Sequence, residues 1–152
     1  MTDNKKGLKI SNAISAALIS CIILCTYAYY ASLISMGYYI MDGSHIFNIV
    51  TGLLLSTAPM TSLMIINVIV LRTRSIGTVE VMQVLTIVVH LIFLFICLGK
   101  DLAFLMVGAM SFMGEVVNYA LEVLLWHILS IIPMIMTAVS CSKIKKSGIL
   151  NN

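Results

Sequence analysis

Four apolar stretches, each about as long as a lipid bilayer is thick, divide this chain. A hydrocarbon layer about 30 Å thick needs roughly 20 helical residues to cross it. Stretches of that length lie at residues 10–36, 46–71, 79–98 and 120–139. Because lipid offers the backbone no hydrogen-bond partners, each stretch is predicted to be a helix. The strict period-two alternation of a barrel strand is absent.

Composition points to the same class of protein. Of the 152 residues, 61% are hydrophobic and 10% are charged, whereas about a quarter of the residues in soluble domains carry charge. The connections are short, which favours helices that run alternately up and down. We therefore predict an all-α integral membrane protein, a four-helix antiparallel bundle in which residues 1–152 form a single transmembrane domain.

The positive charges are predicted to set the orientation. Eight of the nine Lys and Arg residues flank the stretches on one side: Lys5, Lys6, Lys9, Arg72, Arg74, Lys143, Lys145 and Lys146. The opposite connections, residues 37–45 and 99–119, hold only Lys100. By the positive-inside rule both termini are expected in the cytoplasm. The lysines after the last stretch would meet anionic lipid, so the net charge of +3 does not argue for nucleic acid.

Two segments allow more than one interpretation. The first stretch is predicted to stay as a helix rather than be cleaved as a signal peptide, because its apolar run exceeds the usual length of about 7–15 residues. Residues 102–114 are apolar but too short to span. They are interpreted as an interfacial or re-entrant helix on the outer side, or as an N-terminal extension of the last span. A fifth crossing would place the C-terminal lysines outside.

Small and polar side chains recur at helical spacing and mark candidate packing faces. Small residues let helices approach closely in lipid. On the first stretch they form a stripe that comprises Ala13, Ala17, Cys21, Cys25, Ala28, Ser32 and Ser35. On the last stretch the polar counterpart comprises Asn118, Glu122, Trp126, Ser130, Pro133, Thr137 and Ser140. Pro59 and Pro133 are expected to kink their helices. At Pro59, neighbouring hydroxyls are expected to cover the freed carbonyls.

Ionisable side chains at membrane depth are the candidate functional groups, because burying them is costly. The candidate intramembrane polar or ion site comprises His90, Asn118, Glu122 and His127. Glu122 lies near the end of its stretch, so both a solvated rim position and a role in proton or cation coupling are open. His90 and His127 at similar depth could ligate haem b. However, His127 projects away from the polar stripe of its helix, which favours a neutral histidine bonded to a carbonyl or hydroxyl.

The four cysteines do not form a metal or disulfide motif. Cys21 and Cys25 are interpreted as small packing residues. Cys97 and Cys141 belong to opposite sides of the membrane, so no disulfide between them is predicted. Cys141 lies beside the inner surface before Lys143, where reversible palmitoylation is an alternative in a eukaryotic host. No metal site and no cofactor other than the haem alternative is predicted.

The sequence favours a non-enzymatic protein, because no nucleotide-binding, zinc-protease or serine-hydrolase motif is present. The leading hypothesis is an accessory, scaffolding or trafficking component that binds other membrane proteins or itself. The alternatives are a small oligomeric ion-coupled transporter or channel that uses Glu122, and a haem-binding anchor. The outline resembles the broad tetraspan group, which includes MARVEL-type proteins, and the small multidrug exporters. It lacks the acidic residue that the exporters carry on their first helix.

Overall fold

The computed structural model describes residues 5–36, 43–110 and 114–147, which are helical almost throughout and contain no strand. The helices are α1 (Lys6–Ser35), α2 (Gly43–Arg72), α3 (Ile76–Met110), α4 (Gly114–Leu129) and α5 (Ile131–Lys146). Helices α4 and α5 follow one another with only Ser130 between them. The described residues thus form four apolar segments long enough to cross a membrane, the last being Gly114–Lys146. The prediction of four long apolar helices is confirmed.

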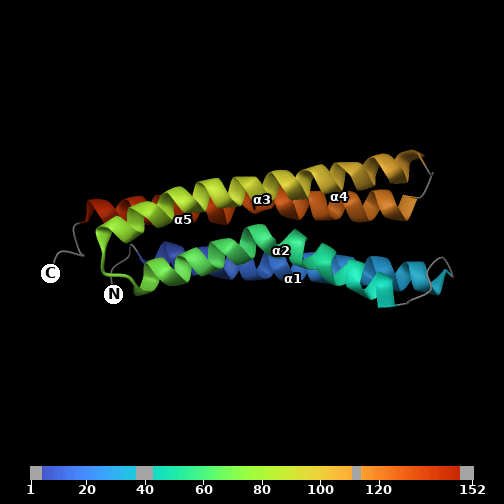
Figure 1. Cartoon of the computed structure of the whole chain (residues 1–152), viewed down its shortest axis with the longest axis horizontal. Coiled ribbons are helices and arrows are strands. Elements are labelled where there is room, and N and C mark those ends of the chain that lie inside the picture. The colour runs from blue at the N-terminus through green and yellow to red at the C-terminus, as the bar shows by residue number, and fades with distance from the viewer. Residues whose placement is uncertain (1–4, 37–42, 111–113, 148–152) are drawn as a thin grey trace.

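The helices lie in two layers (Figure 1). Helices α1 and α2 form one layer, and α3 lies in the other layer beside α4 and α5. The layers contact one another through α2 with α3 and through α1 with α4 and α5. Helix α2 changes direction near its middle, close to Pro59 (Figure 1). Proline explains this bend, because it lacks a backbone N–H and its ring clashes with the carbonyl four residues earlier.

The interpretation of residues 102–114 as a separate interfacial helix or an extension of the last span is wrong. Leu102–Met110 continues α3 without a break, and the last span begins at Gly114 rather than near residue 120. Two glycines, Gly99 and Gly108, do not end the helix, because a helical glycine costs only about 1 kcal/mol. Residues 111–113 lie outside the described part of the chain.

Apolar side chains form two buried clusters and also cover the exterior. One cluster, at the end of the molecule that carries most of the lysines, comprises Leu8, Ile66, Val70, Val79, Cys141 and Ile144. The other, near the middle, comprises Leu18, Ile22 and Met60. Outside, large side chains such as Phe95 and Met110 are 82% and 79% exposed. An apolar exterior of this extent is a poor fit to water and a good fit to lipid.

The buried face of α1 differs from the stripe expected from the sequence. The buried residues are Leu8, Ser11, Ser15, Leu18, Ile22 and Thr26. Of the stripe, Ala13, Ala17, Ala28 and Ser35 are exposed, and Cys21, Cys25 and Ser32 are half-buried. The stripe is therefore not the face on which α1 packs against the rest of this chain.

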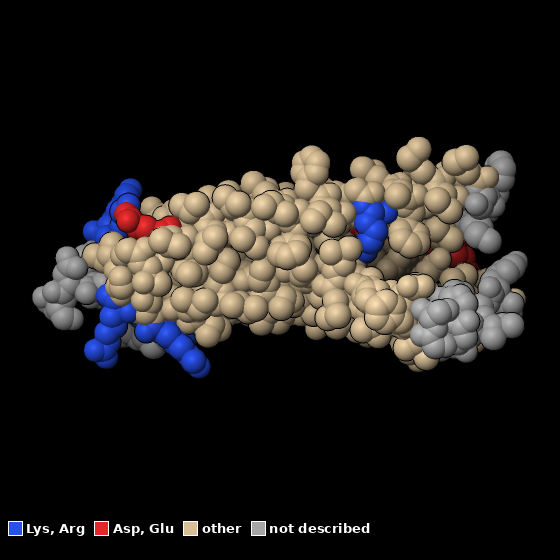
Figure 2. Space-filling model, in the orientation of Figure 1, with Lys and Arg blue, Asp and Glu red and all other residues tan. Residues whose placement is uncertain are grey.

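Charged side chains gather at the two ends of the molecule. Lys and Arg cluster at the end where the termini lie, and one further basic side chain, that of the remaining residue Lys100, stands on the surface toward the other end (Figures 1 and 2). At the basic end Lys145 forms an ion pair with Glu80. Lys5 donates to the carbonyl of Leu71 at 3.2 Å, a favourable place for a cation because helix C-termini carry partial negative charge.

Candidate functional site

Two buried hydrogen-bonded networks lie along the axis of the molecule. The first, which we call the basic-end network, joins α1, α2 and α5 through Ser11, Asn12, Asn67 and Thr137. The Asn67 side chain donates to Asn12 Oδ1 at 2.7 Å and to Ser11 Oγ at 3.2 Å, and its Oδ1 accepts from Thr137 Oγ1 at 2.9 Å. Ser11 in turn donates to the carbonyl of Pro133 at 2.9 Å.

The second network is built around the bend of α2. Pro59 has no N–H, so the carbonyl of Leu55 loses its usual helical partner. Cys97 of α3 fills that place, with Sγ 3.3 Å from the Leu55 oxygen. Serine and threonine hydroxyls near Pro59 bond other carbonyls, as Ser62 does with Pro59 itself. The expectation that hydroxyls cover the freed carbonyl is thus corrected, since a thiol from α3 does so.

His127 of α4 joins α2 and α3. Its Nε2 lies 2.9 Å from the backbone carbonyl of Ser56, and its Nδ1 lies 2.5 Å from Asp101 Oδ2. The imidazole is fully buried and the Asp101 carboxyl is 2% exposed. Lys100 completes the group, with Nζ 3.7 Å from Asp101 Oδ1 and a further hydrogen bond to the Ser56 hydroxyl. The Asp101 carboxyl thus contacts both the buried His127 and Lys100, at a place where the three apolar helices α2, α3 and α4 come together.

His90 of α3 occupies the next level toward the basic end. Its Nδ1 lies 3.1 Å from the Pro59 carbonyl and its Nε2 lies 3.0 Å from Ser130 Oγ. Ser130 separates α4 from α5, where Pro133 removes one helical donor. The Ser130 hydroxyl lies 2.6 Å from the carbonyl of His127, which links the two histidine levels. We call this second set the histidine network: Ser56, His90, Lys100, Asp101, His127 and Ser130.

Nearly all buried polar side chains have a hydrogen-bond partner. Among the described residues, Ser15 Oγ is the one buried side-chain oxygen or nitrogen without a hydrogen-bond partner. An unsatisfied polar group in an apolar interior costs a few kcal/mol, so this pairing is what allows so many polar groups to be buried. Within the part of the chain that the structure describes, no group of three or more His, Cys, Asp or Glu residues is arranged to hold a metal ion.

The four residues of the predicted intramembrane site do not form one site. His90 and His127 belong to the histidine network. Asn118 and Glu122 are exposed instead and line a polar groove of about 190 Å³ between α1 and α4. Glu115 and Cys25 also line this groove, and Glu115 Oε2 accepts from Ser32 at 2.6 Å. His127 does project away from Asn118 and Glu122, as predicted, but the expectation that those two residues mark the inward face of α4 is wrong, because His127 itself lies on the buried face.

Sequence reasoning missed Lys100 and Asp101, which it assigned to an outer connection. One signal could have found Asp101. The buried positions of α3 follow the spacing His90, Leu94, Cys97 and Asp101, in steps of four, three and four residues. Such steps keep side chains on one helix face. A carboxyl on the same face as a histidine is a candidate partner for it.

The geometry does not favour the haem alternative. Haem ligation needs a histidine nitrogen with a free lone pair directed at the iron. In both His90 and His127 each ring nitrogen lies within hydrogen-bond distance of a protein group. Coordination would break one of these contacts in each ring.

Cys141 is fully buried in the cluster near the basic end. S-acylation needs a thiol that an acyltransferase can reach, so lipidation of this residue would require α5 to move away from Leu8 and Val79. Cys21 and Cys25 are half-buried on α1, and Cys25 Sγ accepts from Trp126 Nε1 at 3.4 Å.

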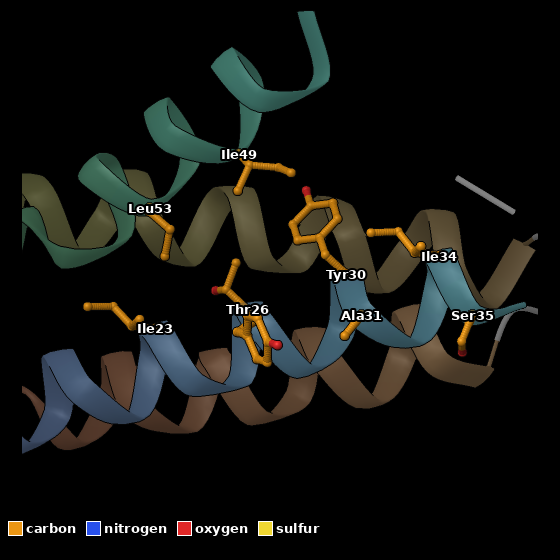
Figure 3. Close-up of a pocket in the computed structure, with 9 residues that line it drawn as sticks. Ile23, Thr26, Tyr30, Ala31, Ile34, Ser35, Ile49 and Leu53 are labelled. Atoms are coloured by element: carbon orange, nitrogen blue, oxygen red, sulfur yellow. The ribbon is translucent and has the colours of Figure 1, made fainter. Parts of the chain in front are cut away.

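An apolar groove of about 480 Å³ separates the distal halves of α1 and α2 (Figure 3). Ile49 and Leu53 of α2 face Ile23 and Tyr30 of α1 across it. The groove lies on the N-terminal side of Pro59 in α2, where α2 diverges from α1. Its lining is mostly aliphatic and aromatic, with the hydroxyl residues Thr26 and Ser35 among it, and such a surface suits a hydrocarbon chain.

Comparisons of the chain with protein-family models, with curated proteins and with solved structures found no match. The candidate sites therefore stand on the sequence and on the geometry described above.

Proposed function

We propose that the chain is an integral membrane protein, an antiparallel bundle of four helices with both termini in the cytoplasm. Four described segments have the length and hydropathy to span a bilayer, and the exterior is apolar. Eight of the nine Lys and Arg residues flank these segments on one side, which supports a cytoplasmic position for that side. Lys143 and Lys146 are exposed there and would meet anionic lipid, whereas the charge of Lys145 is shared with Glu80.

Within the membrane, we propose a non-enzymatic role as an accessory, scaffolding or trafficking component that binds other membrane helices or a second copy. The observation that carries this proposal is the outward position of Ala13, Ala17 and Ala28. These small residues are not used for packing within the chain. Small side chains on a lipid-facing helix surface let a second helix approach closely, which is a main source of helix association in lipid.

Replacement of Ala17 and Ala28 by leucine should reduce association about tenfold. Overpacking a tight helix contact costs about 1–3 kcal/mol, and about 1.4 kcal/mol corresponds to a factor of ten. The measurement is the recovery of companion proteins, and of cross-linked oligomers of the chain, after mild solubilisation. Ala103→Leu on α3 is the matched control, because Ala103 is also exposed but lies on another helix. Unchanged recovery in both α1 variants would refute the proposal.

The second candidate is a small oligomeric ion-coupled transporter or channel. The polar groove between α1 and α4 favours it, because Glu115 and Glu122 line the groove together with Asn118. Carboxyl groups within a membrane segment commonly mark an ion pathway.

Glu122→Gln should abolish ion or proton flux in reconstituted vesicles while the helical content stays unchanged. The amide keeps the size of the side chain and removes its charge. Glu80→Gln is the control, since Glu80 is a half-exposed acid at the basic end. Full flux in Glu122→Gln, or no flux of any tested ion in the parent protein, would remove this candidate.

A further inference from the structure

The hydrogen bonds of His127 determine how many protons it shares with Asp101. A carbonyl oxygen can only accept, so the Nε2 that faces Ser56 must carry a hydrogen. The Nδ1 faces a carboxyl oxygen at 2.5 Å. Two lone pairs would repel at that distance, so a second proton lies between them. Whether this proton rests on the ring or on the carboxyl, the pair holds one proton more than a neutral histidine beside an ionised aspartate.

The surroundings of the pair suit both the presence and the loss of that proton. With the proton bound, Asp101 and His127 together are neutral, as a buried pair among apolar helices should be. Without it, the pair carries one negative charge, and Lys100 Nζ lies 3.7 Å from the carboxyl to balance that charge. Lys100 is 22% exposed, so the network reaches the surface through this side chain.

Other titratable groups also face the pair. Cys97 of α3 lies near enough to His127, and Tyr119 of α4 near enough to Asp101, to interact with them electrostatically. His90 of α3 is linked through Ser130 to the backbone of His127. From α2 the facing groups are the uncharged hydroxyl and carbonyl of Ser56. Besides His127 itself, Lys100 is therefore the described group that can place a positive charge beside Asp101.

We propose that Asp101 and His127 form a proton-binding site, occupied in this structure, and that release of the proton to water weakens the contact of α4 with α2 and α3. On release, the shared proton leaves as hydronium, and a neutral imidazole and a carboxylate remain. Their lone pairs then face one another, so the ring has to turn, which also breaks its bond to Ser56. The site does not involve the exposed face of α1, so this proposal and the proposed association can fail separately.

The protonation state is tested on the full-length protein in lipid vesicles by ¹⁵N NMR of histidine and by infrared spectroscopy. At neutral pH we expect either a doubly protonated His127 or a protonated carboxyl band that is absent in Asp101→Asn. The resonances of His127 are assigned by their loss in His127→Gln. Strongly alkaline pH should remove the signal. A neutral His127 beside an ionised Asp101 at neutral pH would overturn the proposal, and so would a signal that no pH changes.

The effect on helix packing is tested by thermal unfolding. The folded protein holds a proton that the unfolded chain has released in the alkaline range, so stability should fall as the pH rises. We expect the Tm of the parent protein to fall by about 5 °C between neutral and strongly alkaline pH. Asp101→Asn should remove this fall, because the amide N–H donates to Nδ1 in place of the shared proton. Glu80→Gln, at the basic end, should keep it. An equal fall in Asp101→Asn would contradict the proposal.

Discussion

Gly108→Leu is expected to lower the free energy of unfolding by about 3 kcal/mol. A Cβ atom at Gly108 would lie 2.9 Å from Val117 Cγ2, 3.1 Å from Val116 Cγ1 and 3.1 Å from the Val117 backbone nitrogen. Backbone cannot move aside as the end of a flexible side chain can. Overpacking of a tight contact costs about 1–3 kcal/mol, and a leucine against backbone belongs at the upper end of that range.

Gly99→Leu is the matched control, because Gly99 lies on the same helix and a Cβ there would meet nothing within 4 Å. Leucine favours a helix over glycine by up to about 1 kcal/mol, so this variant should be neutral or slightly stabilising. Both variants are measured by detergent-induced unfolding in mixed micelles, followed by circular dichroism and by the fluorescence of the single tryptophan, Trp126. Equal stability of the two variants would show that α3 and α4 do not approach as closely as described.

The four helices could be predicted because their signal is one of length and composition. Charged residues mark the ends of each apolar stretch, and proline marked the bend of α2. Two predictions were wrong at the end away from the lysine cluster: residues 102–110 belong to α3, and Lys100 and Asp101 are not in a connection. Both errors have one cause. The sequence predicts Lys100 and Asp101 at the start of a connection, because isolated charges in an apolar run usually mark the end of a membrane-spanning segment. They lie within α3 instead, because Ser56 and His127 provide partners for both.

The inward faces of the helices were harder to predict. In a soluble helix the apolar side marks the core, but here the exterior is as apolar as the interior, so hydrophobic periodicity carries little information. The polar stripe predicted for the last span begins with three steps of four residues, from Asn118 to Ser130. Each such step turns about 40° beyond a full circle. The buried residues Val116, Ala120, Val123 and His127 alternate steps of four and three, which stay on one face.

The same stripe was correct farther along the chain. Ser130, Pro133, Thr137 and Ser140 are all buried. There the polar side chains themselves make the contacts between helices, so polarity does report the inward face. At the distal half of α4 the polar residues Asn118 and Glu122 are exposed and small apolar residues pack inward. Polarity alone cannot distinguish these two arrangements; a partner on another helix decides between them.

Asn67→Leu is expected to destabilise the protein by about 2 kcal/mol. Asn67 is fully buried and bonds Ser11, Asn12 and Thr137. Hydrogen bonds between membrane helices contribute about 0.6 kcal/mol on average and at most about 1.7 kcal/mol. Three such bonds therefore amount to about 2 kcal/mol. Leucine keeps the branched arrangement of side-chain heavy atoms and is no smaller than asparagine, so the change removes the hydrogen bonds without opening a cavity.

The control for this variant is Asn118→Leu, because Asn118 is exposed on α4 and should tolerate leucine within about 0.5 kcal/mol. Both are measured by the same detergent titration. A loss in Asn67→Leu that is no larger than in Asn118→Leu would mean that the basic-end network does not hold α1, α2 and α5 together. The apolar cluster around Leu8 and Val70 would then have to do so. In that case the polar groups of the interior would be retained for a reason other than stability, which would strengthen a functional interpretation of the histidine network.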